Sequence, residues 1–296
     1  MLRQLNGARD YLVRRLPGRV GDALRLGIYA STYIAPAVPS VRDDRPWVPR
    51  GEIGCQGIDL RESNQLERLD RWKTPPFQDL FGLLRQDPAI NTQRAGQTSL
   101  TNGWYNTPDA EIYAAMIFEH RPRSIVEVGA GFSTLIAKAT IHAGLPTQIT
   151  VVDPAPRTDV QASADECLRL PVERSAIGER DWSAGDVLFI DSSHICRTRG
   201  DIPYLFCQLI PGLPSGVLVH VHDIYIPFDY PNNRDHLCYT EQYVLHALLA
   251  HSPRYRTVLT SHWLSRQHAR RMQETFGPDT ASDVRLYGGC YWFEVV

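Results

Sequence analysis

The stretch GVLVHVHDIYIPFDYP, residues 216–231, begins as an apolar strand and ends in ionisable side chains. Because side chains of a strand alternate between two faces, His220 and His222 lie on the same face. His220 lies inside the strand and is expected to support its neighbour. His222 and Asp223 lie where the strand ends, and are therefore the candidates for direct contact with a ligand.

A second apolar run, DVLFID (186–191), ends in Asp191, and His194 follows three residues later. If the two runs are neighbouring parallel strands, their polar ends meet at one edge of the sheet. Asp191, His222 and Asp223 would suit a divalent metal ion such as Mg²⁺, Mn²⁺, Fe²⁺ or Zn²⁺, which would lower the pKa of a substrate hydroxyl. His194 would then remove the proton as the general base, with Asp191 and His222 as further catalytic residues. The alternative is a metal-free site in which His194 or His222 is the base.

A glycine-rich turn follows a third apolar run, SIVEVGAG (124–131). Gly129 and Gly131 allow the backbone to approach a ligand closely, at the point where a helix N-terminus exposes its N–H groups. Glu127 would repel a pyrophosphate and attract a cationic group, which favours S-adenosylmethionine over a dinucleotide. Asp153 ends the next apolar run and is placed to accept hydrogen bonds from ribose hydroxyls. These four residues are the predicted cofactor-binding positions.

Strands and helices alternate from about residue 106 onward, and this alternation predicts the fold. We expect an α/β protein with a Rossmann-like, seven-stranded, mostly parallel sheet and helices on both faces. Residues 106–296 would form this cofactor-binding domain. Residues 1–105 lack the alternation and are predicted to be an N-terminal, mainly helical extension that acts as a lid.

The bulk composition is that of an ordinary globular chain of 296 residues, with 43% apolar residues and a formal net charge of -2. This charge does not indicate a nucleic-acid partner. No apolar run reaches the roughly 18–20 residues that span a bilayer, so no integral membrane association is expected. The six cysteines contain no CxxC pair, which favours reduced thiols and a cytoplasmic location. A homo-oligomer is left open.

Several motifs resemble those of one enzyme family. SIVEVGAGFST, ITVVDP and DVLFID resemble the first, second and fourth strand motifs of class I S-adenosylmethionine-dependent methyltransferases. NGWYNTPDAEIYAAMI, FIDSSH and VHVHDIYIPFDYP resemble a bacterial small-molecule branch of that fold. The resemblance covers about residues 100–296 and implies that Glu127, Gly129, Gly131 and Asp153 bind the cofactor.

The polar strand ends are similar to those of metal-dependent O-methyltransferases. In that group an acid ends the fourth strand, a base follows three residues later, and two adjacent metal ligands end the fifth strand. Asp191, His194, His222 and Asp223 fall on these positions. His222 departs from the group, which usually has Asp, Glu or Asn at this place.

The leading hypothesis is therefore an enzyme that transfers a methyl group to the hydroxyl of a small molecule, such as a natural product or a sugar. One alternative is a metal-independent N-methyltransferase. A second is a metal-dependent hydrolase or lyase that uses the histidine and aspartate cluster. A third is a non-enzymatic cofactor-binding module, which clustered ionisable residues disfavour.

Overall fold

A computed structural model describes most of the chain, namely residues 54–92, 99–141, 144–156, 158–231, 237–277 and 288–296. Packing divides the chain into a unit of residues 51–230 and 239–296 and a second unit of residues 1–50 and 231–238. The first unit contains the sheet and the site. Most of the predicted lid, residues 1–53, lies outside the described residues.

The first unit is built on a seven-stranded sheet with the order β3-β2-β1-β4-β5-β7-β6. Strand β7 runs antiparallel to its neighbours β5 and β6, and the remaining pairings are parallel. The expected α/β fold with a mostly parallel sheet is thus confirmed. The strand order reverses between β1 and β4, so a crevice is expected beyond the carboxyl ends of these strands. The strands are β1 (Ser124–Val128), β2 (Gln148–Val152), β3 (Glu166–Leu168), β4 (Val187–Ile190), β5 (Leu218–Val221), β6 (Tyr255–Thr260) and β7 (Tyr291–Val295).

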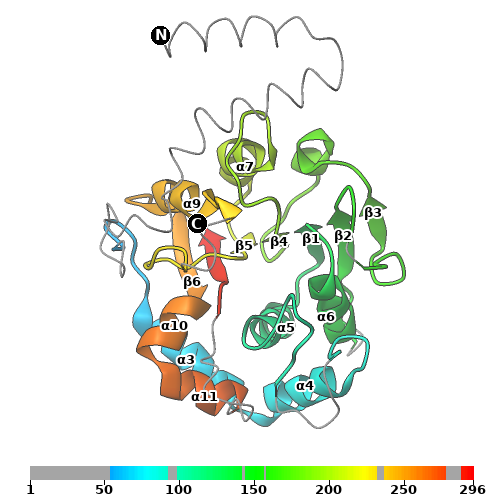
Figure 1. The fold of residues 1–296 in the computed structure, drawn as a ribbon, viewed down its shortest axis with the longest axis vertical. Helices are drawn as coiled ribbons and strands as arrows, with labels where there is room; N and C mark the ends of the chain where they lie inside the picture. The colour runs from blue at the N-terminus through cyan, green and yellow to red at the C-terminus, as the bar shows by residue number, and fades with distance from the viewer. Residues whose placement is uncertain (1–53, 93–98, 142–143, 157, 232–236, 278–287) are drawn as a thin grey trace, which may run out of the picture. The chain divides into compact units, whose positions relative to one another are not determined.

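Helices cover both faces of the sheet (Figure 1). Adjacent residues of one strand point to opposite faces, so Ile125 packs in one hydrophobic core and Val126 in the other. The first core includes α3 (Glu62–Trp72), α4 (Pro75–Gln86), α5 (Asp109–His120), α6 (Phe132–Ile141), α10 (Ser261–Gln267) and α11 (Ala269–Phe276). The second includes α7 (Asp201–Tyr204), a π-helical turn (Leu205–Leu209), α8 (Ile210–Gly212) and α9 (Glu241–Leu249).

Helices α3 and α4 belong to the same core as the sheet. Trp72 and Phe81 are fully buried and both lie against Phe276, with ring centroids 6.2 and 5.7 Å away. Helix α3 buries residues on one face only, as expected of an amphipathic helix that packs its apolar face against a neighbour. Helices α3 and α4 thus share a hydrophobic core with the sheet, and the division of the chain at residue 105 stays a prediction.

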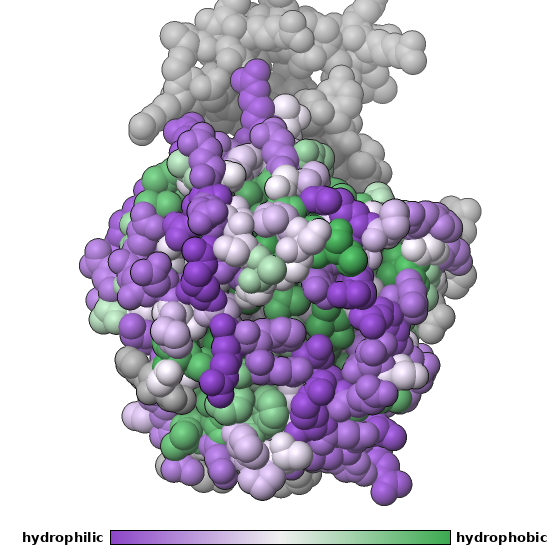
Figure 2. Space-filling view, turned by 180° about the vertical axis from the view of Figure 1, so that it is seen from behind, coloured by the Kyte–Doolittle hydropathy of each residue, from purple (hydrophilic) through white to green (hydrophobic). Residues whose placement is uncertain are grey.

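The face of the molecule drawn in Figure 2 is mainly hydrophilic. Figure 2 shows one face, on which hydrophilic side chains surround smaller apolar areas. Large apolar side chains that are exposed include Leu83 and Trp104. Within the described ranges, none of the helices has both the length and the apolar character that crossing a membrane requires.

Candidate active site

The ends of β4 and β5 bring the predicted polar residues together. Asp191 directly follows β4, and His222 and Asp223 directly follow β5. The two strands are paired in parallel up to Ile190 and Val221, and the N–H of His222 donates to the carbonyl of Ile190 at 2.9 Å. The sheet register itself therefore places these side chains at one edge.

His194 is held between carboxylates on both sides of its ring. Its Nδ1 lies 2.8 Å from Oε2 of Glu241, the first residue of α9, and its Nε2 lies 3.2 Å from Oδ1 of Asp191. Asp223 is also near, with Oδ2 3.8 Å from the same Nε2. Burial opposes a charge on the ring, but the hydrogen bonds to Asp191 and Glu241 outweigh burial and raise the pKa of His194 well above its usual value. The two carboxylates therefore favour the imidazolium form of His194.

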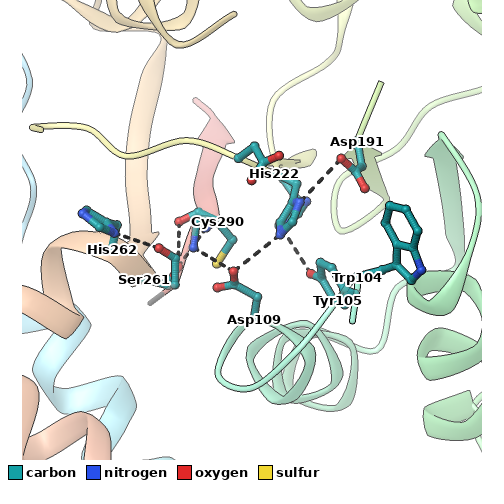
Figure 3. A network of polar contacts seen from close by, with 12 residues as sticks. Trp104, Tyr105, Asp109, Asp191, His222, Ser261, His262 and Cys290 are labelled. Atoms are coloured by element: carbon teal, nitrogen blue, oxygen red, sulfur yellow. Dashed lines mark hydrogen bonds and ion pairs between the residues drawn. The ribbon is translucent and has the colours of Figure 1, made fainter. Parts of the chain in front are cut away.

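His222 is held in the same way (Figure 3). Its Nδ1 lies 3.5 Å from Oδ1 of Asp191, and its Nε2 lies 3.5 Å from Oδ2 of Asp109, the first residue of α5. The ring of Tyr105 packs beside it, with centroids 4.9 Å apart. Burial opposes the charge, but Asp191 and Asp109 outweigh it and raise the pKa of His222 to about 10.

Together these contacts form a chain in which carboxylates and imidazoles alternate: Glu241, His194, Asp191, His222 and Asp109. We refer to these five residues as the carboxylate–histidine chain. Oδ1 of Asp191 faces both imidazoles, and their hydrogen bonds and charge hold the pKa of Asp191 well below its usual range despite its burial. The Asp191 side chain is 29% exposed, whereas the other four are 11% exposed or less. Asp191 is therefore the member that a ligand would meet first.

Two residues of the site have unusual backbone conformations. His194 and Asp223 have φ angles of 60° and 55°, in the left-handed region that favours glycine. Such conformations are retained at functional sites when the surrounding structure enforces them. Here Asp223 accepts a hydrogen bond from the hydroxyl of Tyr225 at 3.0 Å. The two loops thus direct His194 and Asp223 toward the same place.

The glycine turn touches the site directly. The N–H of Asp191 donates to the carbonyl of Val128 at 2.8 Å, and Gly129 has a φ of 89°. A Cβ atom on Gly129 would lie 2.0 Å from the carbonyl oxygen of Asp191. The packing of the protein therefore requires a glycine at position 129, with or without a ligand. A Cβ on Gly131 would meet no atom within 4 Å.

Replacing each glycine with alanine separates these two roles. Gly129→Ala is expected to lower the free energy of unfolding by at least roughly 1–2 kcal/mol, because an L-residue must adopt the left-handed conformation and also displace Asp191. Gly131→Ala is the matched control and is expected to change it by less than about 1 kcal/mol. Urea unfolding of both variants measures the difference. Equal stability losses would contradict the assignment of Gly129.

Asp153 lies at the open end of β2, as predicted. Its Oδ2 accepts the N–H of Ala130 at 2.9 Å, and its Oδ1 accepts the N–H of Ala155 at 2.7 Å. The residue is partly exposed. Each carboxylate oxygen has about two lone-pair positions, so both oxygens of Asp153 can accept a further hydrogen bond from a ligand.

Glu127 lies in the interior rather than at an open surface. It is fully buried, and it accepts hydrogen bonds from the hydroxyl of Tyr113 at 2.8 Å and from Thr134. Thr134 stands where a dinucleotide fingerprint would have its third glycine. Burial raises the pKa of Glu127 to about 7, although the two hydrogen bonds lower it. Direct contact between Glu127 and a cofactor stays a prediction.

The raised pKa of Glu127 makes folding pH-dependent. Its ordinary value is 4.5, so the folded protein binds the proton more tightly than the unfolded chain does. This stabilisation is fully present below about pH 4.5 and is lost as pH rises through about 7. The Glu127→Gln side chain cannot ionise. As pH rises from 4 to 8, the free energy of unfolding of Glu127→Gln is therefore expected to increase by roughly 3 kcal/mol relative to that of the wild type. Urea unfolding across this range tests it, and parallel curves for the two proteins would contradict it.

The three predicted metal ligands lie close together, but each one contacts another residue of the site: Asp191 contacts His194, His222 contacts Asp109, and Asp223 contacts Tyr225. Among the residues that the structure describes, no group of three or more His, Cys, Asp or Glu side chains is arranged to hold a metal ion. An imidazolium must also lose a proton before it can ligate a metal. The cluster as it stands is a network of ion pairs, and metal binding stays a prediction.

The sequence singles out neither Asp109 nor Glu241 as a site residue, because an acid at a helix start is favourable in any case. Both are the first residues of their helices, and both are buried. Only the packing of α5 and α9 against the ends of β4 and β5 shows that each one faces a histidine. The sequence carries no signal for that contact beyond the presence of an acid.

Comparisons with known proteins find one related sequence over part of the chain and a set of distantly similar solved structures. No family model matches the chain. A protein from Archaeoglobus fulgidus, described as uncharacterized, is 34% identical over 96 residues, which are 32% of this chain and 41% of that protein. The match thus spans about two fifths of that relative's length.

Similar solved structures include two O-methyltransferases. One is the O-methyltransferase from Bacillus cereus in complex with SAH, at 12% identity and a TM-score of 0.42, covering 89% of this chain and 97% of that chain. The other is the O-methyltransferase TomG from Streptomyces achromogenes, involved in tomaymycin synthesis, in complex with SAM. It has 13% identity and a TM-score of 0.42, and covers 82% of this chain and 97% of that chain.

Proposed function

We propose that this protein is an S-adenosylmethionine-dependent methyltransferase that methylates a hydroxyl of a small molecule. One observation carries the proposal: the glycine turn after β1 lies against the backbone of Asp191, the centre of the carboxylate–histidine chain. A place for close backbone approach to a ligand and a cluster suited to proton transfer are thus adjacent at the carboxyl ends of β1 and β4.

The residues around the turn fit the cofactor. Gly131 borders open space directly before α6, where a ligand can approach the exposed N–H groups of the helix. Asp153 has lone pairs left for two ribose hydroxyls. S-adenosylmethionine, when bound, supplies a methyl group on a positively charged sulfur. The anionic members of the cluster suit a cation in their neighbourhood.

His194 is proposed as the general base. Glu241 holds its Nδ1, which leaves Nε2 directed toward Asp191 and the exposed side of the site. The acceptor hydroxyl would give its proton to this Nε2, while its oxygen bonds the methyl carbon as the carbon–sulfur bond breaks. Because the raised pKa favours the imidazolium form of His194, that form must first release its proton to solvent before the ring can act as a base. Positive charge brought into the site favours that loss.

Asp191 and Asp223 are proposed to orient the acceptor. Carboxylates accept hydrogen bonds from neighbouring hydroxyls, so a natural-product or sugar hydroxyl suits them. No step of this account requires a metal. The alternative is a metal-assisted reaction, and removing metal ions with a chelator distinguishes the two.

A methyl-transfer assay tests the proposal. The purified protein, S-adenosylmethionine and a panel of hydroxylated natural products and sugars are incubated between about pH 6 and pH 10, and S-adenosylhomocysteine release is measured. Release is expected to rise with pH, up to tenfold per unit, until the pKa of His194 is passed. Release is expected to be the same with EDTA. Loss with EDTA that Mg²⁺ restores would establish the metal-assisted version, and release that falls as pH rises would contradict His194 as base.

A further inference from the structure

We infer that Asp109 is a positioning residue of this site, which fixes the ring of His222 and, through it, the carboxylate of Asp191. The inference takes from the proposed function only the reaction that the site would serve. The contacts that carry it are independent of any reaction.

Asp109 is anchored at a fixed place. It is the first residue of α5 and is 5% exposed. Its Oδ2 accepts the N–H of Gly289 at 2.7 Å. The next residue, Cys290, exchanges two hydrogen bonds with Ser261: its N–H donates to the Ser261 hydroxyl at 2.8 Å, and the Ser261 N–H donates to its carbonyl at 3.0 Å (Figure 3).

The same backbone segment also holds the loop that follows β5. The N–H of Ile224 donates to the carbonyl of Gly289 at 2.8 Å, and the Cα atom of Asp223 lies 3.6 Å from the place where a Gly289 Cβ would be. Gly289 therefore links Asp109 on one side to the loop that carries His222 and Asp223 on the other. Asp109 and His222 are fixed relative to each other by main-chain contacts, in addition to their own.

The oxygen that accepts from Gly289 also faces His222. Oδ2 of Asp109 is 3.5 Å from Nε2 of His222, and Nδ1 of the same ring is 3.5 Å from Asp191 (Figure 3). Tyr105 packs beside the ring and limits its movement. Because the two ring nitrogens are bound on opposite sides, rotation of the ring would break both contacts. Asp109 thereby determines which nitrogen faces Asp191.

The opposite end of the carboxylate–histidine chain is built in the same manner. Glu241, the first residue of α9, holds Nδ1 of His194, and Nε2 of that ring faces Asp191. Asp191 thus receives one imidazole from each side, and each imidazole is held by an acid at the start of a helix. The helix dipole alone makes an acid in the first turn favourable, and this effect requires no particular side-chain partner. The pairing of each acid with a histidine is what indicates positioning.

The test compares Asp109→Asn with two further variants. Asp109→Glu keeps the charge and is expected to restore part of what Asn loses. Glu111→Gln is the matched control: Glu111 is a fully buried acid on α5 that lies 3.0 Å from Arg85 and accepts from the hydroxyl of Thr107 at 2.7 Å. A general cost of removing a buried acid from α5 would affect both Asp109→Asn and Glu111→Gln.

The first readout is the position of the His222 ring, measured by nuclear Overhauser contacts between its protons and those of Tyr105. These contacts are expected to change in Asp109→Asn, to return toward the wild-type pattern in Asp109→Glu, and to be unaltered in Glu111→Gln. Unaltered contacts in Asp109→Asn would overturn the inference. This readout decides the matter even if the wild type fails to bind S-adenosylmethionine, a result that would instead overturn the proposed function.

The second readout is turnover. Asp109→Asn is expected to lower kcat about 10- to 100-fold, because small misplacements of reacting groups are costly, and to leave the dissociation constant of S-adenosylmethionine within about twofold. Glu111→Gln is expected to keep kcat. A kcat loss in Asp109→Asn no larger than that in Glu111→Gln would overturn the inference.

Discussion

His194→Gln is expected to reduce methyl transfer by about 10²–10⁴-fold, the usual contribution of a positioned general base. Gln retains an amide that can bond to Glu241, so the buried carboxylate keeps a partner. The affinity for S-adenosylmethionine is expected to be unchanged, because the residues proposed to bind the cofactor lie at the turn after β1 and at the end of β2. Single-turnover rates and calorimetric titration measure the two quantities separately.

His246→Gln is the matched control for this variant. His246 is a half-buried histidine further along α9, the helix that begins with Glu241. The His246→Gln variant is expected to transfer methyl groups at the wild-type rate. If His194→Gln retains more than about a tenth of wild-type turnover, the proton is removed by another group.

Asp191→Asn is expected to have the largest effect on stability, because the two imidazoles would lose the carboxylate that they share. Removing one partner from buried charge pairs costs about 3–5 kcal/mol, and partial exposure of Asp191 places the expected loss near the lower end, roughly 3 kcal/mol. Methyl transfer is expected to fall as well, because both histidines lose their common orientation. Urea unfolding at several pH values measures the first effect.

The pH dependence of that loss follows from two pKa shifts. Asp191 and Asp109 outweigh burial and raise the pKa of His222 to about 10, so its stabilisation is fully present below about pH 6.5 and is lost as pH rises toward 10. The pKa of Asp191 is held well below 3.8, so its stabilisation is present above about pH 3.8 and is lost as pH falls below that value. The difference between wild type and Asp191→Asn is therefore expected to be greatest between about pH 4 and 6.5. Asp159→Asn, at an exposed acid, is the control, and a difference that grows above pH 8 would contradict this account.

Much of the fold could be predicted because its signals are local. Apolar runs with polar ends predicted the strands, and the rule for parallel sheets predicted that Asp191, His222 and Asp223 would meet. The antiparallel β7 between β5 and β6 could not be placed, because strand order depends on long-range pairing. The sequence also does not show where residues 54–105 pack: the pattern of α3 indicates a helix with one apolar face, but not which core that face joins.

The site was predictable only in part, for reasons visible in single residues. Glu127 was predicted to bind the cofactor, but the sequence does not show how deeply it lies: both faces of β1 are covered, and all residues of the strand are buried. Its partners Tyr113 and Thr134 come from α5 and α6, and no sequence spacing relates them. Asp109 and Glu241 resemble ordinary acids at helix starts. Their contacts with the histidines depend on how each helix packs against the sheet.

Calorimetric titration of the full chain tests most directly the proposal that S-adenosylmethionine binds beside Asp191, at the carboxyl ends of β1, β2 and β4. We predict saturable binding of one molecule per chain that EDTA does not alter. Asp153→Ala is expected to weaken it by about tenfold or more, since hydrogen bonds to a charged group contribute about 1.5–3 kcal/mol. Asp159→Ala, at an exposed acid beyond the same strand, is expected to leave it unchanged. Absence of saturable binding, or equal affinities for all three proteins, would contradict the account.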